Sequence, residues 1–291
     1  MRLRVVEHLS DPGTPGRTNE DVAGFSSTAT WVLDGATGLG DEPLLAEDSD
    51  AAWLARTFDV RLRAEADRAD RSLPEIFGAL IGDVAAEFAA KVRRPPAGRY
   101  EVPSAGMAMV RLRRGVLEYA RLGDCRAIIS AGGRVVTTGD SPLHHLDAAV
   151  VRRMREVRSA SPSLASEEVF RAVLGEMRAI RTLMMNTEGG YWVLGTDPAA
   201  ALRMEVGTVP LDAAGGVWGL LVSDGFYRLV DTVGLVRDPA ALLDAARKDR
   251  LGGLVAALRA REGSDPECVA YPRIKPSDDA TALLFEAGPG G

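Results

Sequence analysis

The sequence predicts an α+β protein in which antiparallel sheets carry helices on their outer faces. Short apolar runs joined by tight glycine turns are typical of strands linked as hairpins, and they occur in separate blocks along the chain. Between these blocks, apolar residues recur at helical spacing in pairs of segments. A parallel sheet would instead alternate single strands with single helices, so this order favours antiparallel sheets with helices layered outside them.

The first third of the chain is expected to form strands and then two helices. Residues up to Leu33 are read as strands, and the apolar run 29–33 stops at Asp34. The second helix begins with a capping box made by Ser72 and Glu75. The predicted buried faces are Trp53, Leu54, Phe58 and Leu62 in the first helix, and Leu73, Ile76, Phe77, Leu80, Ile81, Val84 and Phe88 in the second.

The middle of the chain predicts an antiparallel meander followed by a second helix pair. Strands are expected at 106–112, 116–122, 126–130 and 134–138, with turns at 114–115 and 132–133. The apolar stripes of the helix pair are Val150, Val151, Met154 and Val157, and then Val169, Phe170, Val173, Leu174, Met177 and Ile180.

The last third returns to strands at 191–194, 204–209 and 217–222. Asp238 and Pro239 are expected to start a helix as its N-cap and first residue. Its buried-face candidates are Leu242, Leu243, Leu254, Val255 and Leu258. A final strand is predicted at 281–285.

Length and composition indicate one globular domain. The chain has 291 residues, 46% of them hydrophobic, and shows no clean boundary, so we expect a single domain over 1–287 and a short tail over 288–291. The net charge of −6 gives no positive field that would attract nucleic acid or an anionic membrane. Two isolated cysteines and the lack of a signal peptide or long apolar run favour the cytoplasm. The oligomeric state stays open.

Acidic residues at predicted strand ends are the main candidates for chemistry. Asp34 and Asp224 each follow an apolar run and precede a glycine, and Asp278 comes just before the final strand. A carboxylate held by a sheet can bind a cation, although Asp-Gly after a strand is also simply a favourable turn. Further acids lie beside strands at Glu20, Asp21 and Asp124.

The ligand types indicate a hard cation. Carboxylate oxygens suit Mg²⁺ or Mn²⁺ rather than zinc, because the sequence has no cluster of histidine and cysteine. The histidines His8, His144 and His145 are expected to have structural or surface roles. The glycine-rich stretch 34–40 follows a strand but lacks both nucleotide-binding glycine patterns and is followed by Asp41 and Glu42, so it does not predict a phosphate loop.

Five motifs in order resemble those of the metal-dependent serine/threonine protein phosphatases of type 2C, in particular the bacterial members. They are Arg17-Thr18-Asn19-Glu20-Asp21, Val32-Leu33-Asp34-Gly35, Leu122-Gly123-Asp124-Cys125-Arg126-Ala127, Val222-Ser223-Asp224-Gly225-Phe226 and Asp278-Asp279-Ala280-Thr281. The resemblance covers nearly the whole chain. It implies a four-layer α-β-β-α sandwich with two central antiparallel sheets flanked by helix pairs.

The resemblance also implies roles for these residues. Asp34 would bridge two Mg²⁺ or Mn²⁺ ions, and the carbonyl of Gly35 would bind one of them. Asp224 and Asp278 would complete the shell of the other ion, and Glu20 and Asp21 would hold metal-bound waters. Asp124 would bind a third ion, and Arg17 would bind the substrate phosphate.

Two positions differ from the family pattern. Arg17 lies four residues before Asp21, closer than is usual in the family, so a surface role for this arginine remains an alternative. Ala36 follows the Asp34-Gly35 pair where a histidine proposed as general acid is often found. We therefore expect water to protonate the leaving group.

Electrostatic repulsion between the acids is a further reason to expect that the site requires metal ions. If Asp21, Asp34, Asp224 and Asp278 converge at ~5 Å, each pair repels by ~3 kcal/mol at an effective dielectric of about 20. Six pairs total ~20 kcal/mol, more than the ~5–15 kcal/mol stability of a typical domain. Cations or protons must relieve this repulsion.

The function expected from the sequence is hydrolysis of phosphoserine and phosphothreonine monoesters in phosphorylated proteins, with a metal-bridging hydroxide as nucleophile and Asp34 and Asp224 as the central residues. Two alternatives remain. One is a pseudo-phosphatase that binds a phosphoprotein or a regulatory partner with little turnover, and the other is a phosphatase of small metabolites.

Overall fold

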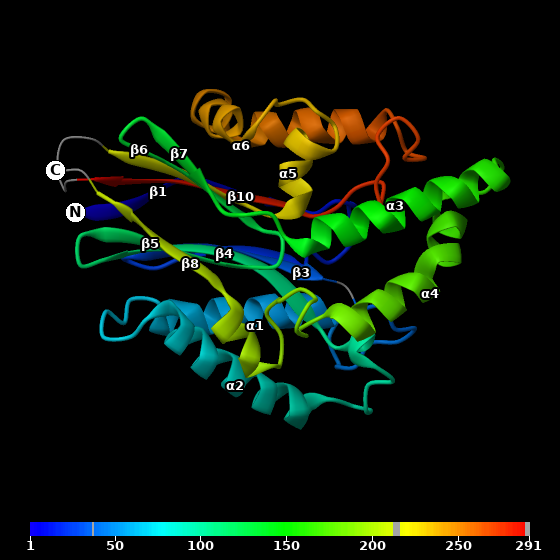
Figure 1. Cartoon of the computed structure of the whole chain (residues 1–291), viewed down its shortest axis with the longest axis horizontal. Helices are drawn as coiled ribbons and strands as arrows, with labels where there is room; N and C mark the ends of the chain where they lie inside the picture. The colour runs from blue at the N-terminus through cyan, green and yellow to red at the C-terminus, as the bar shows by residue number, and fades with distance from the viewer. Residues whose placement is uncertain (37, 212–215, 289–291) are drawn as a thin grey trace.

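Two five-stranded antiparallel sheets stack in the middle of the molecule (Figure 1). The computed structural model describes residues 1–36, 38–211 and 216–288. One sheet has the strand order β1-β10-β9-β6-β7, and the other has the order β2-β3-β4-β5-β8. The strands are β1 (Arg2–Asp11), β2 (Asp21–Phe25), β3 (Ala29–Ala36), β4 (Ser104–Arg113), β5 (Val116–Leu122), β6 (Arg126–Ala131), β7 (Arg134–Thr137), β8 (Glu205–Pro210), β9 (Val217–Val222) and β10 (Ala280–Gly288).

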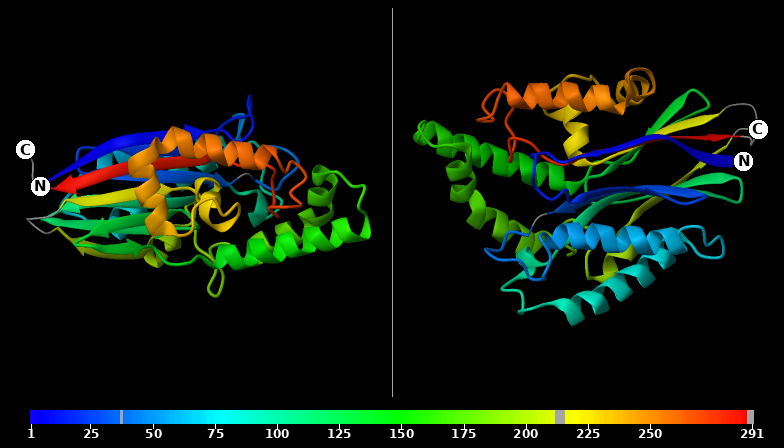
Figure 2. Two further views of the ribbon diagram at one scale, coloured as in Figure 1. Left: turned by 90° about the horizontal axis from the view of Figure 1, so that it is seen from above. Right: turned by 180° about the vertical axis from the view of Figure 1, so that it is seen from behind.

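Helices cover the outer face of each sheet, which completes four layers (Figures 1 and 2). Helices α1 (Asp50–Glu65) and α2 (Leu73–Lys91) pack on the β2–β8 sheet. Helices α5 (Asp224–Asp231) and α6 (Pro239–Gly263) pack on the β1–β7 sheet. The remaining helices are α3 (Pro142–Ala160), α4 (Ser166–Met184) and the short 3₁₀ segments η1 (Arg99–Glu101) and η2 (Pro198–Arg203). The predicted α+β class and its α-β-β-α layers are confirmed.

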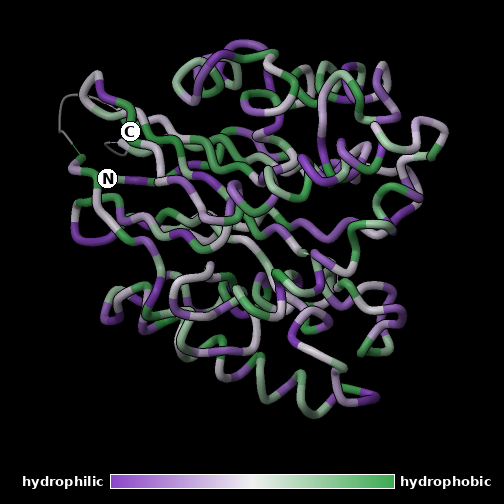
Figure 3. Tube along the Cα trace, turned by 45° about the vertical axis from the view of Figure 1, so that its right-hand side comes forward, coloured by the Kyte–Doolittle hydropathy of each residue, from purple (hydrophilic) through white to green (hydrophobic). Residues whose placement is uncertain are grey.

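Three apolar clusters hold the layers together. The cluster between the sheets includes Val32, Val110, Ile129, Leu221 and Phe285. Two others lie under α1 and α2 and under α5 and α6. The strands in the centre of Figure 3 are accordingly mostly hydrophobic, whereas the helices alternate in hydropathy along their length. Burial on both faces explains why strands such as β4 read as continuous apolar runs.

The second predicted helix pair forms, but it does not cover a sheet. Helices α3 and α4 project as a hairpin beyond the end of the sandwich that lies opposite the chain termini (Figures 1 and 2). The hairpin has a small core of its own, made by Val150, Met154, Val169 and Val173. The second covering layer comes instead from α5 and α6. Each of these two helices buries only two side chains. An apolar stripe this narrow can be covered by the other helix of the pair, without a sheet.

The predicted meander over 106–138 is wrong. Strands β4 and β5 belong to one sheet, whereas β6 and β7 belong to the other, because β5 pairs with β8 and β6 pairs with β9. The chain crosses between the sheets at Gly123, whose φ is +73°. A local glycine signal marks a change of direction but does not say whether the next strand pairs with the preceding one.

The predicted strand at 191–194 is also wrong, because this segment forms only two isolated bridges, between Met185 and Tyr191 and between Ala105 and Leu194. Three of its residues, Tyr191, Val193 and Leu194, are buried although the segment is a loop, which explains its apolar sequence. Other strands are longer than expected: β3 runs to Ala36, β4 covers 104–113, β6 ends at Ala131, and β10 covers 280–288. Gly288, the first residue of the predicted tail, thus ends β10, while 289–291, like Thr37 in the glycine-rich stretch, lie outside the described residues. In the described part of the chain, no helix is long and apolar enough to span a bilayer.

Candidate active site

Strand pairing places Asp21, Asp34 and Asp124 side by side at one end of the β2–β8 sheet. Asp21 on β2 lies directly opposite Asp34 on β3, and Asp34 lies opposite Gly106 on β4. A Cβ atom at Gly106 would come within 2.9 Å of Asp124 Oδ1, so the glycine leaves room for this carboxylate. Facing positions of an antiparallel pair bring side chains close, and like charges there are destabilising. The arrangement therefore concentrates negative charge.

Asp224 reaches this cluster from the other sheet. It is the first residue of α5, because β9 ends at Val222 and Ser223 is the N-cap. The backbone N–H of Asp224 donates a hydrogen bond to Asp34 Oδ2 at 3.2 Å. The sequence analysis missed α5, reading Asp224 only as a strand end. The helix start holds the residue at the seam between the two sheets.

Asp278 and Asp279 lie beside the same seam, just before β10. The Asp279 carboxylate accepts hydrogen bonds from the backbone N–H groups of Gly13 at 3.0 Å and Glu20 at 2.7 Å. Asp278 instead pairs with two cations, Arg228 at 2.9 Å and Lys275 at 3.2 Å. Asp279 thus fixes the loop that carries Arg17, and Asp278 is neutralised by the protein itself.

The two glycines after the aspartates do not serve as turns, which corrects the sequence interpretation. Gly35 is paired with Ala105 within β3, and Gly225 lies in the first turn of α5. A Cβ at Gly35 would be 2.5 Å from the Glu20 carbonyl oxygen, and one at Gly225 would be 1.9 Å from that of Asp279. Both glycines are therefore required by close backbone approach.

Glu20 and Arg17 lie near the cluster, but neither touches its carboxylates by a described hydrogen bond. The Glu20 side chain accepts a 2.5 Å hydrogen bond from Ser49, the N-cap of α1, and its carbonyl oxygen accepts one from Gly35 N–H at 3.2 Å. Arg17 is exposed on the loop between β1 and β2. The structure thus brings Asp21, Asp34, Asp124 and Asp224 together and leaves Arg17 at the rim.

Burial and mutual repulsion dominate the electrostatics of this cluster. Burial raises the pKa of Asp21, Asp34 and Asp124 well above the ordinary value, and neighbouring carboxylates raise it further. The pKa of Asp224 is raised for the same two reasons. Burial alone would also raise the pKa of Asp278, but Lys275 and Arg228 hold it below the ordinary value.

Asp147 on α3 is a further acid that the sequence analysis missed. Burial, and then the charge of Asp224, raise its pKa to about 7, while Arg181 on α4 acts in the opposite direction. A signal existed in the sequence, because Asp147 shares the helical stripe of Val150 and Met154 on an otherwise charged helix. The projecting hairpin thus adds a carboxylate and an arginine to the edge of the site.

The donor chemistry fits a divalent cation near Asp34. Asp21 is 7% exposed, and its Oδ2 atom is buried without a hydrogen-bond partner. Oxygen ligands of this kind are those that Mg²⁺ and Mn²⁺ prefer. Over 1–36, 38–211 and 216–288, however, no group of three or more His, Cys, Asp or Glu side chains is already arranged to hold an ion. The carboxylates would have to turn toward a bound cation.

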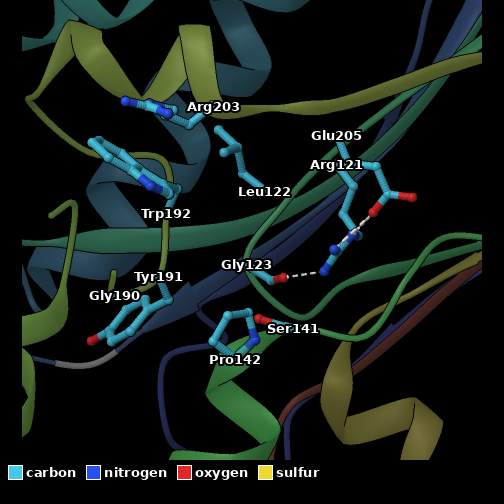
Figure 4. Close-up of a pocket in the computed structure, with 10 residues that line it drawn as sticks. All are labelled: Arg121, Leu122, Gly123, Ser141, Pro142, Gly190, Tyr191, Trp192, Arg203 and Glu205. Carbon is cyan, nitrogen blue, oxygen red and sulfur yellow. Dashed lines mark hydrogen bonds and ion pairs between the residues drawn. The ribbon is translucent and has the colours of Figure 1, made fainter. Parts of the chain in front are cut away.

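A pocket beside Gly123 is a less suitable site (Figure 4). Its arginines already have partners: Arg121 pairs with Glu205 at 2.7 Å and with the Gly123 carbonyl oxygen at 2.6 Å, and Arg203 pairs with Glu188 and lies over the ring of Trp192. Arg121 thus joins β5 to β8, and Arg203 packs against Trp192. The carboxylate cluster remains the strongest candidate.

Comparison with known proteins identifies the fold. No family model matches the chain, and no curated protein matches its sequence. Among solved structures, the Mycobacterium tuberculosis serine/threonine phosphatase PstP/Ppp matches with a TM-score of 0.57 at 15% identity, covering 99% of this chain and 100% of that one. PppA of Pseudomonas aeruginosa, described as a key regulatory component of T6SS, matches with a TM-score of 0.57 at 16% identity, covering 98% and 97%.

A third structure is the catalytic domain of PstP in complex with two manganese ions, with a TM-score of 0.53 at 14% identity and 99% coverage of both chains. These matches run over nearly the whole length of each protein. They agree with the two sheets and their helical layers. The chain therefore has the fold of the bacterial metal-dependent serine/threonine protein phosphatases of type 2C.

Proposed function

We propose that the protein is a metal-dependent phosphatase that hydrolyses phosphoserine and phosphothreonine monoesters in proteins. The observation that carries this proposal is the cluster of Asp21, Asp34, Asp124 and Asp224 on a phosphatase fold. Asp21 is buried and the other three are partly exposed, and among the described residues no lysine or arginine donates a hydrogen bond to them. Such a cluster needs cations or protons to be stable.

Asp34 and Asp224 are the central residues of the proposed site. Asp34 lies between Asp21 and Asp124, and Asp224 contacts it through its backbone N–H. Together with Glu20 and the Gly35 carbonyl, they would hold Mg²⁺ or Mn²⁺. A bound divalent cation supplies Lewis-acid chemistry, that is, activation of water and neutralisation of phosphoryl charge.

No protein nucleophile is proposed. Cys125 lies next to Asp124, but burial and the surrounding carboxylates raise the pKa of its thiol well above the ordinary value. The thiol therefore stays protonated and weakly nucleophilic. Water as nucleophile, and water as the proton donor to the leaving group, are consistent with Ala36 after Gly35.

The substrate phosphate is proposed to bind at Arg17. The loop that carries this residue is fixed beside Asp278 by the two hydrogen bonds to Asp279. A guanidinium group binds phosphate through two parallel hydrogen bonds. The two isolated cysteines support action in the cytoplasm.

Activity on p-nitrophenyl phosphate should require added Mn²⁺ or Mg²⁺ and disappear with EDTA. Asp224→Asn should lower kcat/KM roughly 100-fold, because it removes a ligand charge with almost no change in volume. Asp244→Asn, an exposed position on α6, is the matched control and should act like the native protein. Full turnover in metal-free buffer would refute the proposal.

A second assay defines the substrate class. Phosphoserine and phosphothreonine peptides should be hydrolysed with higher kcat/KM than small phosphorylated metabolites of equal charge. The reverse order would favour a metabolite phosphatase, and binding of phosphopeptide without turnover would favour a pseudo-phosphatase.

A further inference from the structure

Asp278 differs from the other acids of the site because its carboxylate is already bound by protein cations. Its Oδ2 accepts a hydrogen bond from Arg228 Nη2 at 2.9 Å, and its Oδ1 accepts one from Lys275 Nζ at 3.2 Å and one from Asp279 N–H at 3.2 Å. A carboxylate oxygen has about two lone pairs. Both lone pairs of Oδ1 therefore accept hydrogen bonds, and Oδ2 has one lone pair that accepts none of these bonds.

A partly buried ion network holds these cations in place: Arg228 and Glu262 are buried, whereas the side chains of Lys275 and Asp11 are 44% and 37% exposed. Arg228 also donates to Glu262 at 3.1 Å, and Arg259 donates to the other oxygen of Glu262 at 2.6 Å and to the Asp278 carbonyl oxygen at 2.7 Å. Asp11 completes the network by accepting from Arg259 at 2.8 Å. The members are three cations, Arg228, Arg259 and Lys275, and three anions, Asp11, Glu262 and Asp278, so the network is neutral without a metal ion.

The position of Arg228 supports a role directed at Asp278. It lies four residues after Asp224 on α5, so the two side chains share one helix face. An arginine pointing toward a helix N-terminus is opposed by the helix dipole. Arg228 is nonetheless 7% exposed, and its buried charge is compensated by Glu262 and Asp278. The contacts to Glu262 and Asp278 therefore explain why an arginine is buried at this position.

The other carboxylates of the site have no direct contact of this kind, although the charges of Arg228 and Lys275 also favour the ionised form of Asp224. In the described ranges, Asp21, Asp34, Asp124 and Asp224 accept no hydrogen bond from a lysine or arginine, and Asp21 Oδ2 has no partner at all. Asp278 thus has an arginine and a lysine as hydrogen-bond partners, whereas Asp34 has neither among the described residues.

We propose that Arg228 and Lys275 replace one of the two divalent cations expected for this fold, so that the chain binds one Mg²⁺ or Mn²⁺ ion, at Asp34 and Asp224, and Asp278 is not a ligand. The inference rests on the proposed metal-dependent function. A second divalent cation at Asp278 would compete with Lys275 and Arg228 for the same oxygens and would be repelled by both.

The number of bound ions tests this directly. Equilibrium dialysis of the full chain against Mn²⁺ should give one ion per chain. Asp278→Asn should weaken Mn²⁺ binding by less than tenfold, whereas Asp224→Asn should weaken it by more than a hundredfold. Two ions per native chain, or a loss in Asp278→Asn as large as in Asp224→Asn, would overturn the proposal. The count on the native chain decides the question even if a variant fails to fold.

A gain of binding is the complementary test. Lys275→Met removes one of the two donors to Oδ1 of Asp278, leaving only the Asp279 N–H, and should allow a second, weaker Mn²⁺ ion to bind. Lys248→Met, an exposed lysine on α6, is the matched control and should keep a count of one. A count of one in Lys275→Met would overturn the role of Lys275.

These outcomes separate the inference from the proposed function. Two ions together with Mn²⁺-dependent hydrolysis would overturn the inference alone. A chain that binds no Mn²⁺ and hydrolyses phosphate esters in EDTA would overturn both.

Discussion

Arg17 shows how a single residue depends on contacts made elsewhere. The residue itself is exposed, but the carboxylate of Asp279 holds Gly13 and Glu20, which flank it in the sequence. Both ends of the loop are therefore anchored next to Asp278. An arginine on such a loop can reach a phosphate bound at the carboxylates without being buried in the free protein.

Arg17→Ala should raise KM for a phosphothreonine peptide, because a phosphate contact is made in the ground state as well as in the transition state. The expected loss of ~1.5–3 kcal/mol corresponds to a tenfold to hundredfold fall in kcat/KM. Steady-state kinetics measures it. Arg237→Ala, whose side chain is 84% exposed, is the control. Unchanged kinetics in Arg17→Ala would remove this residue from the site.

Among the secondary-structure elements, the α3–α4 hairpin is attached to the rest of the molecule by arginine contacts and by hydrogen bonds from Ser166 to Glu267. Arg178 on α4 donates to the Leu39 carbonyl oxygen at 2.7 Å and to Asp41 at 2.8 Å, and it lies over the Tyr100 ring. At the start of α3, Arg126 of β6 contacts His144 at 3.1 Å. Burial and Arg126 lower the pKa of His144 to about 4, so this histidine is neutral and accepts the hydrogen bond at neutral pH.

Arg178→Ala should loosen α4, because it removes all three contacts to the segment 39–100 at once. Hydrogen exchange of the amides in 166–184 should become faster, while exchange in the sheets should stay unchanged. Arg171→Ala is a matched control on the same helix, since Arg171 is exposed and its ion pair in the described part of the chain is with Glu167, one turn away on α4. Equal exchange in the two variants would show that other contacts anchor the hairpin.

At the scale of the whole molecule, the acidic cluster makes stability depend on pH. In the unfolded chain Asp147 has an ordinary pKa of about 3.9, whereas in the folded protein it is raised to about 7. The folded state therefore binds more protons between these values. Protonation of Asp147 therefore stabilises the fold fully below about pH 3.9, and this stabilisation is lost as the pH rises through about 7.

The metal-free protein should therefore be less stable at pH 8 than at pH 5, by about 3 kcal/mol from Asp147 alone. Urea unfolding in EDTA at the two pH values measures the difference. Asp147→Asn should reduce it, whereas Glu156→Gln, an exposed acid on the same helix, should leave it as it is. Equal stability at both pH values would contradict the buried, raised state of Asp147.

Local patterns in the sequence were enough to predict the fold class, most helices and strands, and a set of candidate acids, of which the structure brings Asp21, Asp34, Asp124 and Asp224 together. These depend on local information, namely apolar spacing, capping residues such as Ser72 and Asp238, and short motifs around each acid. The same local signals explain the errors. The segment 191–194 is apolar because it is buried, and hydropathy does not distinguish a buried loop from a strand.

Only the tertiary structure decided which residues meet. The crossing at Gly123 sends β6 to the other sheet, and the register of β2, β3 and β4 sets Asp21, Asp34 and Asp124 in a row. The pairing of Asp278 with Arg228 joins positions 50 residues apart, and Asp147 comes to the site from a separate helix, α3. Lys275, by contrast, lies only three residues before Asp278 in the sequence. Charge compensation between distant segments, such as that of Asp278 by Arg228, depends on distance in space, which no local pattern in the sequence encodes.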